Sequence, residues 1–283
     1  MTAETPELVV LGVAQDGGHP QAGCAASCCA EAFADPRMGH RIACIGVRTS
    51  AGGWLLDATP DLRWQAHALG VPLRGVVLTH AHLGHYTGVL QLGPEAWGAQ
   101  RMPVHAMPGM SGFLLEHQPF ASLFDEGTLT LAPLAAEQPV ALADGVTLTP
   151  WIVPHRGPWS ETVALHVQGP GASAVYLPDI DDLDRWERPV ADVLEEVDVL
   201  WLDGTFYDGS ELPHRDLAGI PHPFVTDTMD RLDHLPLRLR QRVHFVHLNH
   251  SNPLLDPHSE AHREVLRRGY RVARQGDRLQ LKA

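Results

Sequence analysis

The sequence predicts an α/β fold. Short apolar runs rich in β-branched residues, which indicate strands, alternate along the chain with segments whose apolar residues follow the helical repeat. The 26 Gly and 23 Pro residues fit many short strands and tight turns. With 44% hydrophobic residues, the 283-residue chain can bury a sizeable core. No linker, low-complexity block or internal repeat divides the chain, so we expect one domain over residues 1–283.

The first half of the chain predicts a sheet with helices inserted between its strands. Strands are expected at Leu8–Val13, Ile42–Thr49, Trp54–Asp57, Gly75–Leu78 and Pro103–Ala106. Helices are expected at Leu62–Leu69, Thr87–Trp97 and Met110–His117. Ala51-Gly52-Gly53 is a turn signal of the hairpin type, and Pro60 suits the start of a helix because its φ is fixed.

The second half predicts a second set of strands. Residues 121–153 are expected to be β-rich. Strands are expected at Val146–Val153, Thr162–Val167, Ala174–Leu177, Val197–Leu202, Arg242–Val246, Tyr270–Ala273 and Leu279–Leu281. Helices are expected at Val190–Glu196, Phe224–Leu235 and His258–Gly269. The long polar segment Gly204–Pro223, which carries His214 and His222, is typical of an active-site loop.

The charge of the chain argues against some classes of partner. It has 34 acidic and 21 basic residues, for a formal charge of −13. This balance disfavours non-specific binding to nucleic acid or to an anionic membrane, although bound divalent cations would leave room for an anionic small-molecule substrate. Without an apolar signal segment or membrane-spanning run, the protein is expected in the cytoplasm. The oligomeric state is left open, with a homodimer as one option.

The clearest chemical signal follows the strand Gly75–Leu78. His80, His82 and His85 lie within six residues directly after it. Imidazole is the commonest protein ligand for zinc and similar divalent metals. Histidines at i, i+2 and i+5 in a tight loop can direct several ring nitrogens into one small volume, so the loop predicts a metal site.

Other strand ends supply candidate partners for this loop. His155, Asp179 and His247 each follow an apolar strand. Taken singly, such a histidine is more often a satisfied hydrogen-bonding residue, and such an aspartate a turn or helix cap. Their recurrence favours a metal site, because ligands gather at one edge of an α/β sheet. Asp57 either caps a helix or orients a metal-bound histidine.

The chain has four cysteines, three of which form a cluster. Cys24, Cys28 and Cys29 can converge on one tetrahedral zinc if a distant fourth ligand joins them. The alternative is a set of small buried thiols. In the expected compartment a metal site is more plausible than a disulfide framework. Cys44, in an apolar run, is expected in the core.

The order of these motifs resembles the metallo-β-lactamase superfamily. The likeness runs through essentially the whole chain, from Asp57 and the 79–85 histidine loop to His247. It implies an αββα sandwich with one or two metals at the edge between the sheets. Within the superfamily, residues 17–21 with the following cysteines, and residues 247–253, resemble segments of the pyrroloquinoline quinone biosynthesis protein B group. A related phosphodiesterase of phosphonate degradation pairs an N-terminal cysteine cluster with a late histidine at a structural zinc.

The resemblance implies roles for the candidate residues. The first metal would be held by His80, His82 and His155, and the second by His85 and His247, with Asp179 bridging the two. A structural zinc would be held by Cys24, Cys28, Cys29 and His250. The superfamily motif normally has aspartate where this chain has Gly84. Without that carboxylate the second position is weaker, and we expect a single tightly bound metal or partial second occupancy.

Three classes of function follow. The first is hydrolysis of a small phosphodiester, lactone or other ester by a metal-activated water, with zinc as the expected metal and manganese or iron as alternatives. Asp179 would orient the water or accept its proton. His222 resembles a histidine that related phosphodiesterases direct at the phosphate or leaving group, or it is simply a polar loop residue.

The second class is oxidative. His85, His247 and Asp179 make up two histidines and one carboxylate, the ligand set of non-haem iron oxygenases. The quinone-biosynthesis resemblance favours this class, because that pathway requires oxidation of a tyrosine-derived precursor. The third class is a metal-binding protein without catalysis.

Overall fold

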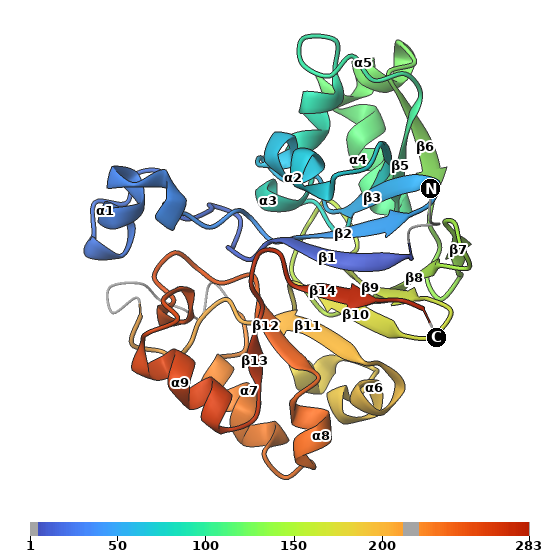
Figure 1. The fold of residues 1–283 in the computed structure, drawn as a ribbon. Coiled ribbons are helices and arrows are strands. Elements are labelled where there is room, and N and C mark those ends of the chain that lie inside the picture. The colour runs from blue at the N-terminus through green and yellow to red at the C-terminus, as the bar shows by residue number, and fades with distance from the viewer. Residues whose placement is uncertain (1–4, 212–220, 283) are drawn as a thin grey trace.

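Two seven-stranded sheets face each other in this computed structural model, which describes residues 5–211 and 221–282 (Figure 1). The first sheet has the order β14 (Arg278–Gln280), β1 (Glu7–Gly12), β2 (Cys44–Thr49), β3 (Gly52–Leu56), β4 (Leu73–Val77), β5 (Met102–Ala106) and β6 (Leu129–Pro133). The second has the order β13 (Arg271–Val272), β12 (Val243–Val246), β11 (Val199–Asp203), β10 (Ser173–Leu177), β9 (Val163–Gln168), β8 (Thr147–Ile152) and β7 (Val140–Ala141).

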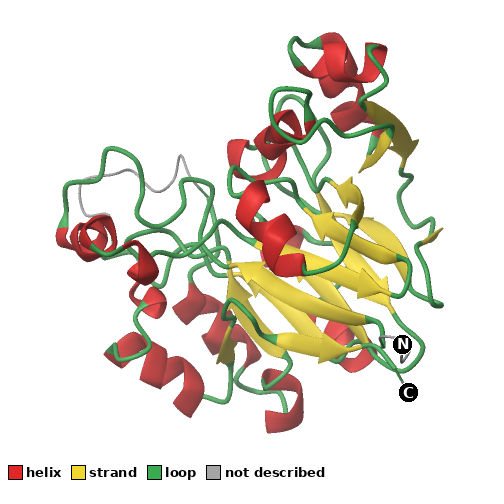
Figure 2. Ribbon diagram, turned by 45° about the horizontal axis from the view of Figure 1, so that its top comes forward, coloured by secondary structure: helices red, strands yellow, loops and turns green. Residues whose placement is uncertain are grey.

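Helices cover the outer face of each sheet (Figures 1 and 2). The first sheet is covered by α2 (Leu62–Leu69), α3 (Leu83–Tyr86), α4 (Pro108–Glu116) and α5 (Phe120–Asp125). The second is covered by α6 (Val190–Glu196), α7 (Val225–Leu232), α8 (Leu237–Arg240) and α9 (Glu260–Arg267). One apolar core lies between the sheets, and one lies under each helical layer. The predicted α/β class and the αββα sandwich implied by the resemblance are therefore confirmed.

Several predicted helices differ from the observed elements. The helix predicted over Thr87–Trp97 is wrong. A 3-10 turn at Thr87–Leu92 follows α3, and it stops at Gly93-Pro94 because proline disfavours a helical residue before it. The region predicted as β-rich from residue 121 starts inside α5, a short helix whose N-cap is Pro119. Among the described residues, no helix is long and apolar enough to cross a membrane.

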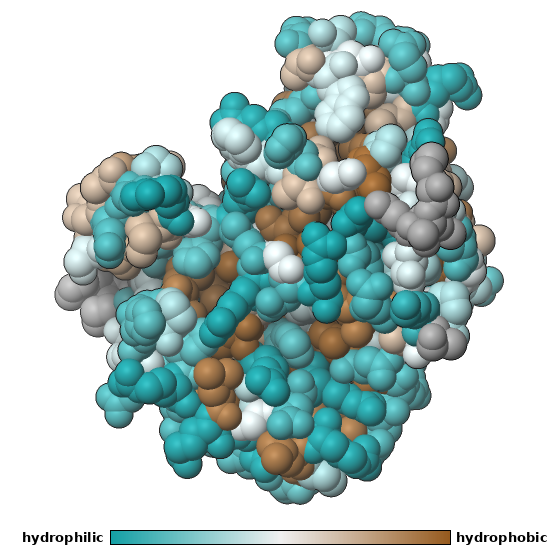
Figure 3. Space-filling view, in the orientation of Figure 1, coloured by the Kyte–Doolittle hydropathy of each residue, from teal (hydrophilic) through white to brown (hydrophobic). Residues whose placement is uncertain are grey.

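The segment around α1 (Ser27–Ala34) projects from the sandwich (Figure 1). The space-filling view shows it as a lobe beside the main body (Figure 3). The chain segments that lead into and out of the lobe pair with each other at Ala14 and Ile42, and Ala14 also pairs with Leu248. The lobe therefore stands on the same edge of the sandwich at which β1 and β12 end.

Candidate metal centre

The sheet topology brings the strand-end residues to one edge. In the first sheet β1 runs in the same direction as β3, because both are antiparallel to β2, and β4 is parallel to β3. In the second sheet β8 runs with β10, because both are antiparallel to β9, and β11 and β12 are parallel to β10. The carboxyl ends of all these strands meet, and the candidate ligands His80, His82, His85, His155, Asp179 and His247 cluster there.

The first donor group consists of His80, His82, His155 and Asp179. His82 Nδ1 lies 2.9 Å from His80 Nε2 and 3.1 Å from His155 Nε2. The carboxylate of Asp179 lies 3.8 Å from His80 Nε2 and 3.7 Å from His155 Nε2. The donors of a tetrahedral zinc with nitrogen and oxygen ligands are about 3.3 Å apart. The spacing of the group therefore fits one metal ion.

Neighbouring groups fix the protonation of these rings. The Thr79 hydroxyl donates to Asp57 and therefore accepts a proton from His80 Nδ1, 2.9 Å away. Asp181 Oδ1 lies 2.8 Å from His155 Nδ1, an ion-pair distance without hydrogen-bond geometry. His80 consequently turns the lone pair of Nε2 towards the cluster, and the carboxylate beside Nδ1 of His155 favours the same arrangement there. Burial keeps the pKa of His80 and of His155 below the usual range, and it lowers the pKa of His82 to about 4, so the rings are in the neutral form that metals bind.

The second donor group contains His85 and His247, as predicted, together with Asp16, which the sequence reasoning missed. His85 Nε2 lies 3.0 Å from Asp16 Oδ1 and 3.3 Å from His247 Nε2. His247 Nε2 lies 3.4 Å from Asp16 Oδ1. The prediction of a weak second position counted only the shared Asp179 as a carboxylate. The structure places the carboxylate of Asp16 beside the two histidines as well.

Asp179 adjoins both groups. Its Oδ2 lies 3.1 Å from His85 Nε2 and 3.4 Å from His247 Nε2. This oxygen is buried and has no hydrogen-bond partner among the described residues. Although burial opposes its charge, the nearby histidines hold the pKa of Asp179 well below its usual range. A buried, ionised oxygen without a donor is what a bridging metal ligand requires.

Asp57 orients His85 and caps no helix. Its Oδ2 lies 2.6 Å from His85 Nδ1, while α2 has Asp61 at its N-cap. Asp57 and His247 both have positive φ, 73° and 62°. The left-handed region costs a non-glycine residue about 1–2 kcal/mol. The fold thus bears strain at two residues of this centre.

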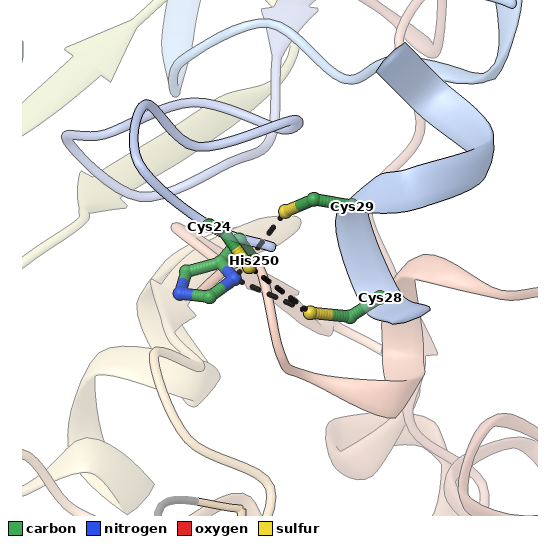
Figure 4. Close-up of side chains that lie close together, drawn as sticks. All are labelled: Cys24, Cys28, Cys29 and His250. Carbon is green, nitrogen blue, oxygen red and sulfur yellow. Dashed lines mark hydrogen bonds between the residues drawn. The ribbon is translucent and has the colours of Figure 1, made fainter. Parts of the chain in front are cut away.

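The thiol cluster forms a third donor group in the projecting lobe (Figure 4). Cys24 Sγ lies 3.7 Å from Cys28 Sγ, and His250 Nδ1 lies 3.5 Å from Cys28 Sγ and from Cys29 Sγ. A tetrahedral zinc with three thiolates and one imidazole separates sulfurs by about 3.8 Å and sulfur from nitrogen by about 3.6 Å. The four residues fit such an ion. Cys44 is fully buried in the apolar core, as expected.

A cavity of about 380 Å³ opens onto the two histidine groups. The cavity is lined by His82, Asp16 and Asp179 of these groups, and also by Arg156 and His222. His222 Nδ1 lies 2.7 Å from Asp203 Oδ2, a partner that the sequence reasoning did not identify. Burial opposes protonation of His222, but Asp203 raises its pKa above the usual value. His214 lies outside the described residues.

Comparison with known proteins agrees with this geometry. Residues 54–248, more than half of the chain, match the family model described as "Beta-lactamase superfamily domain". The chain belongs to the β-lactamase superfamily. Among curated members, coenzyme PQQ synthesis protein B of Gluconacetobacter diazotrophicus is 29% identical, over 96% of this chain and 99% of that protein. The protein of the same name from Methylobacterium sp. is also 29% identical, over 95% and 98%.

Two solved structures share the fold over nearly the whole chain. Zinc-bound PqqB from Methylobacterium extorquens superposes with a TM-score of 0.80 at 24% identity, over 96% of this chain and 99% of that one. A diphosphatase from the PhnP family superposes with a TM-score of 0.69 at 23% identity, over 98% of both chains. The superfamily fold implies a divalent metal, and the donor groups of this chain fit one.

Proposed function

We propose that this superfamily member is a metal-dependent hydrolase that acts on a small phosphodiester, or on a lactone or other ester. The observation that carries the proposal is the pair of adjoining donor groups, which share Asp179 and open onto one polar cavity. Metals held by such groups would lower the pKa of a bound water and polarise the scissile bond. Zinc is the proposed ion, because the donor spacings fit its bond lengths; manganese or iron is the alternative.

The residues of the chain supply the remaining chemistry. Asp179 is ionised at the junction of the two groups, where it can orient the attacking water or accept its proton. His222, held by Asp203 and lining the same cavity, would give a proton to the leaving oxygen. Arg156 and His222 line the cavity and are paired with Asp181 and Asp203, and their N–H groups can donate to the oxygens of an anionic substrate; this leads us to place phosphodiesters first.

The third group is proposed as a structural zinc site. Four protein donors close its coordination sphere and leave no open position for substrate. His250 follows His247 by three residues, so an ion in the lobe would tie the lobe to the segment that supplies an active-site ligand. Its role is to hold the edge of the sandwich in place.

The test combines metal analysis with activity under two atmospheres. Protein purified without added metal is analysed for zinc, manganese and iron, and then assayed with bis(4-nitrophenyl) phosphate, a cyclic nucleotide and a lactone. We expect zinc or manganese and turnover that is the same with and without oxygen, lost on chelation and regained on adding metal. Absence of any hydrolysis by the metal-loaded protein would refute the proposal.

An oxygenase is the second candidate. It is favoured by the similarity to proteins named coenzyme PQQ synthesis protein B over nearly the whole chain. His85, His247 and Asp179 would then hold iron. The presence of Asp16 beside them weighs against this reading, because it adds a second carboxylate to the three-ligand set. Iron in the purified protein together with strictly oxygen-dependent turnover would favour the oxygenase.

A further inference from the structure

We propose that Asp16 replaces the missing aspartate of the histidine motif and completes a second metal site. The carboxylate comes from the loop after β1 instead of from the histidine loop, and Gly84 leaves the space that it occupies. The inference deepens the proposed function, because it rests on the metal centre proposed there. It concerns metal binding, so it can be tested independently of the reaction.

The position of Asp16 relative to Gly84 is the first argument. A Cβ atom placed on Gly84 would lie 2.6 Å from Asp16 Cα and 2.9 Å from Asp16 Cγ. Non-bonded carbon atoms attract best at about 3.5–4.0 Å, so no side chain fits at residue 84 while Asp16 is there. The volume that a carboxylate on residue 84 would enter is already occupied by the carboxylate of Asp16.

The second argument is the geometry of the donors. His85 Nε2, His247 Nε2, Asp16 Oδ1 and Asp179 Oδ2 are joined by five measured distances between 3.0 and 3.4 Å. A tetrahedral zinc separates such donors by about 3.3 Å. With Asp16 included, the second group matches this value more closely than the first group, in which Asp179 lies 3.7 and 3.8 Å from two rings.

The third argument is the arrangement of protons. Asp57 accepts the proton of His85 Nδ1. Thr205 donates its hydroxyl to Asp203 and therefore accepts the proton of His247 Nδ1, 3.0 Å away. With Nδ1 of each ring facing an acceptor, Nε2 of each ring faces the carboxylate oxygens of Asp16 and Asp179. A cation among these four atoms would be held by two imidazole nitrogens and two carboxylates.

The loop that carries Asp16 is held against the ligand segment. Gln15 N donates to Leu248 O at 2.8 Å, and Leu248 N donates to Val13 O at 2.8 Å. These bonds fix Asp16 relative to the neighbouring His247. The same loop continues to Cys24, whose donor group includes His250. Asp16 is therefore anchored from both sides, as a ligand that must keep its geometry requires.

The test counts metals in chelator-stripped protein titrated with Zn²⁺ in competition with a chromogenic chelator. We expect three zinc ions per wild-type chain. Asp16→Ala and the isosteric Asp16→Asn should bind the ion of the second group at least about 100-fold more weakly and keep the other two. Gln15→Ala, on the same loop, is the matched control and should bind all three with wild-type affinity.

A double-mutant cycle separates a ligand from a merely structural carboxylate. Gly84→Ala adds a methyl group in the space of Asp16 and should also weaken the second ion. If both changes act through the Asp16 carboxylate, the double variant Asp16→Ala/Gly84→Ala should bind the second ion no more weakly than Asp16→Ala alone. Wild-type zinc affinity in Asp16→Asn, or losses that add in the double variant, would overturn the inference. If wild-type protein bound zinc in neither histidine group, the proposed hydrolase would fail instead.

Discussion

The two regions that gather metal-type donors differ in how they are built. The thiol group takes three of its donors from residues 24–29 and one from His250, and its four donors close on one another. The histidine groups take their donors from the ends of strands in both sheets, and they open onto a cavity. A closed tetrahedral set is suited to holding structure, whereas an open set leaves room for water and substrate.

The difference also concerns support. In the histidine groups, a carboxylate or a hydroxyl contacts the ring nitrogen that faces away from the other donors. Asp57 contacts Nδ1 of His85, and Thr205 contacts Nδ1 of His247. The thiols are instead contacted by backbone groups in the described chain: Gln21 N donates to Cys29 Sγ, and the backbone of Ala26 hydrogen-bonds to Cys24. The proposed catalytic centre would therefore depend on the rigid sandwich around it, while the lobe would depend on a bound ion.

The largest expected effect is the loss of Asp179. Asp179→Asn removes the only carboxylate that adjoins both histidine groups in the described chain, so activity should fall by about 10³-fold or more. Metal analysis should show that both active-site ions bind more weakly while the lobe retains its ion. Unchanged zinc affinity at the histidine groups would contradict the bridging role.

The next effect concerns His222 and acts on chemistry rather than on metal. His222→Asn should lower kcat by about 100-fold, because the leaving oxygen loses its proton donor. In the wild type, activity should decline as pH rises through the pKa of His222, which Asp203 raises above the usual value. The variant should lack this alkaline limb and contain a normal amount of metal. If His222→Asn kept the alkaline decline in activity, that decline would belong to the titration of another group.

A smaller effect, on metal affinity, is expected from Thr205, which contacts a metal-binding histidine and not the metal position itself. Thr205→Val removes the hydroxyl that accepts the Nδ1 proton of His247 and keeps the volume of the side chain. Outer partners of this kind are worth about 10–100-fold in metal affinity. Zinc titration should show this loss for the second ion, with His80, His82 and His155 still holding the first. Thr162→Val is a matched control, because its hydroxyl has no hydrogen-bond partner among the residues that the structure describes.

The smallest effect at the active centre should come from the lobe. Cys29→Ser should release the lobe ion, which stabilises the fold by about 4 kcal/mol when free zinc is 1,000 times its Kd. Through the loop that carries Asp16, it should also weaken the second active-site ion by about fivefold. Thermal unfolding and zinc titration measure the two effects. Cys44→Ala, in the apolar core, is the control for loss of a thiol and should leave all metals bound.

Much of the centre follows from local sequence. Histidines two and five residues apart after a buried strand must lie close together whatever the rest of the chain does, so His80, His82 and His85 were predictable. The strand-end positions of His155, Asp179 and His247 were predictable for the same reason, since the carboxyl ends of parallel strands meet at one edge. Helix α2 was predicted at its observed bounds because its start and end signals are local.

Tertiary structure alone decided how the second group is completed. In the sequence alone, Gly84 indicates that a carboxylate ligand is missing, because no local pattern connects residue 84 with Asp16. The link exists only once β1 lies antiparallel to β2 and its carboxyl end joins the edge where β4 and β12 end. Asp203 and Thr205 were missed for the same reason. Local spacing determines where a metal can bind, but the packing of distant strands determines how many carboxylates reach it.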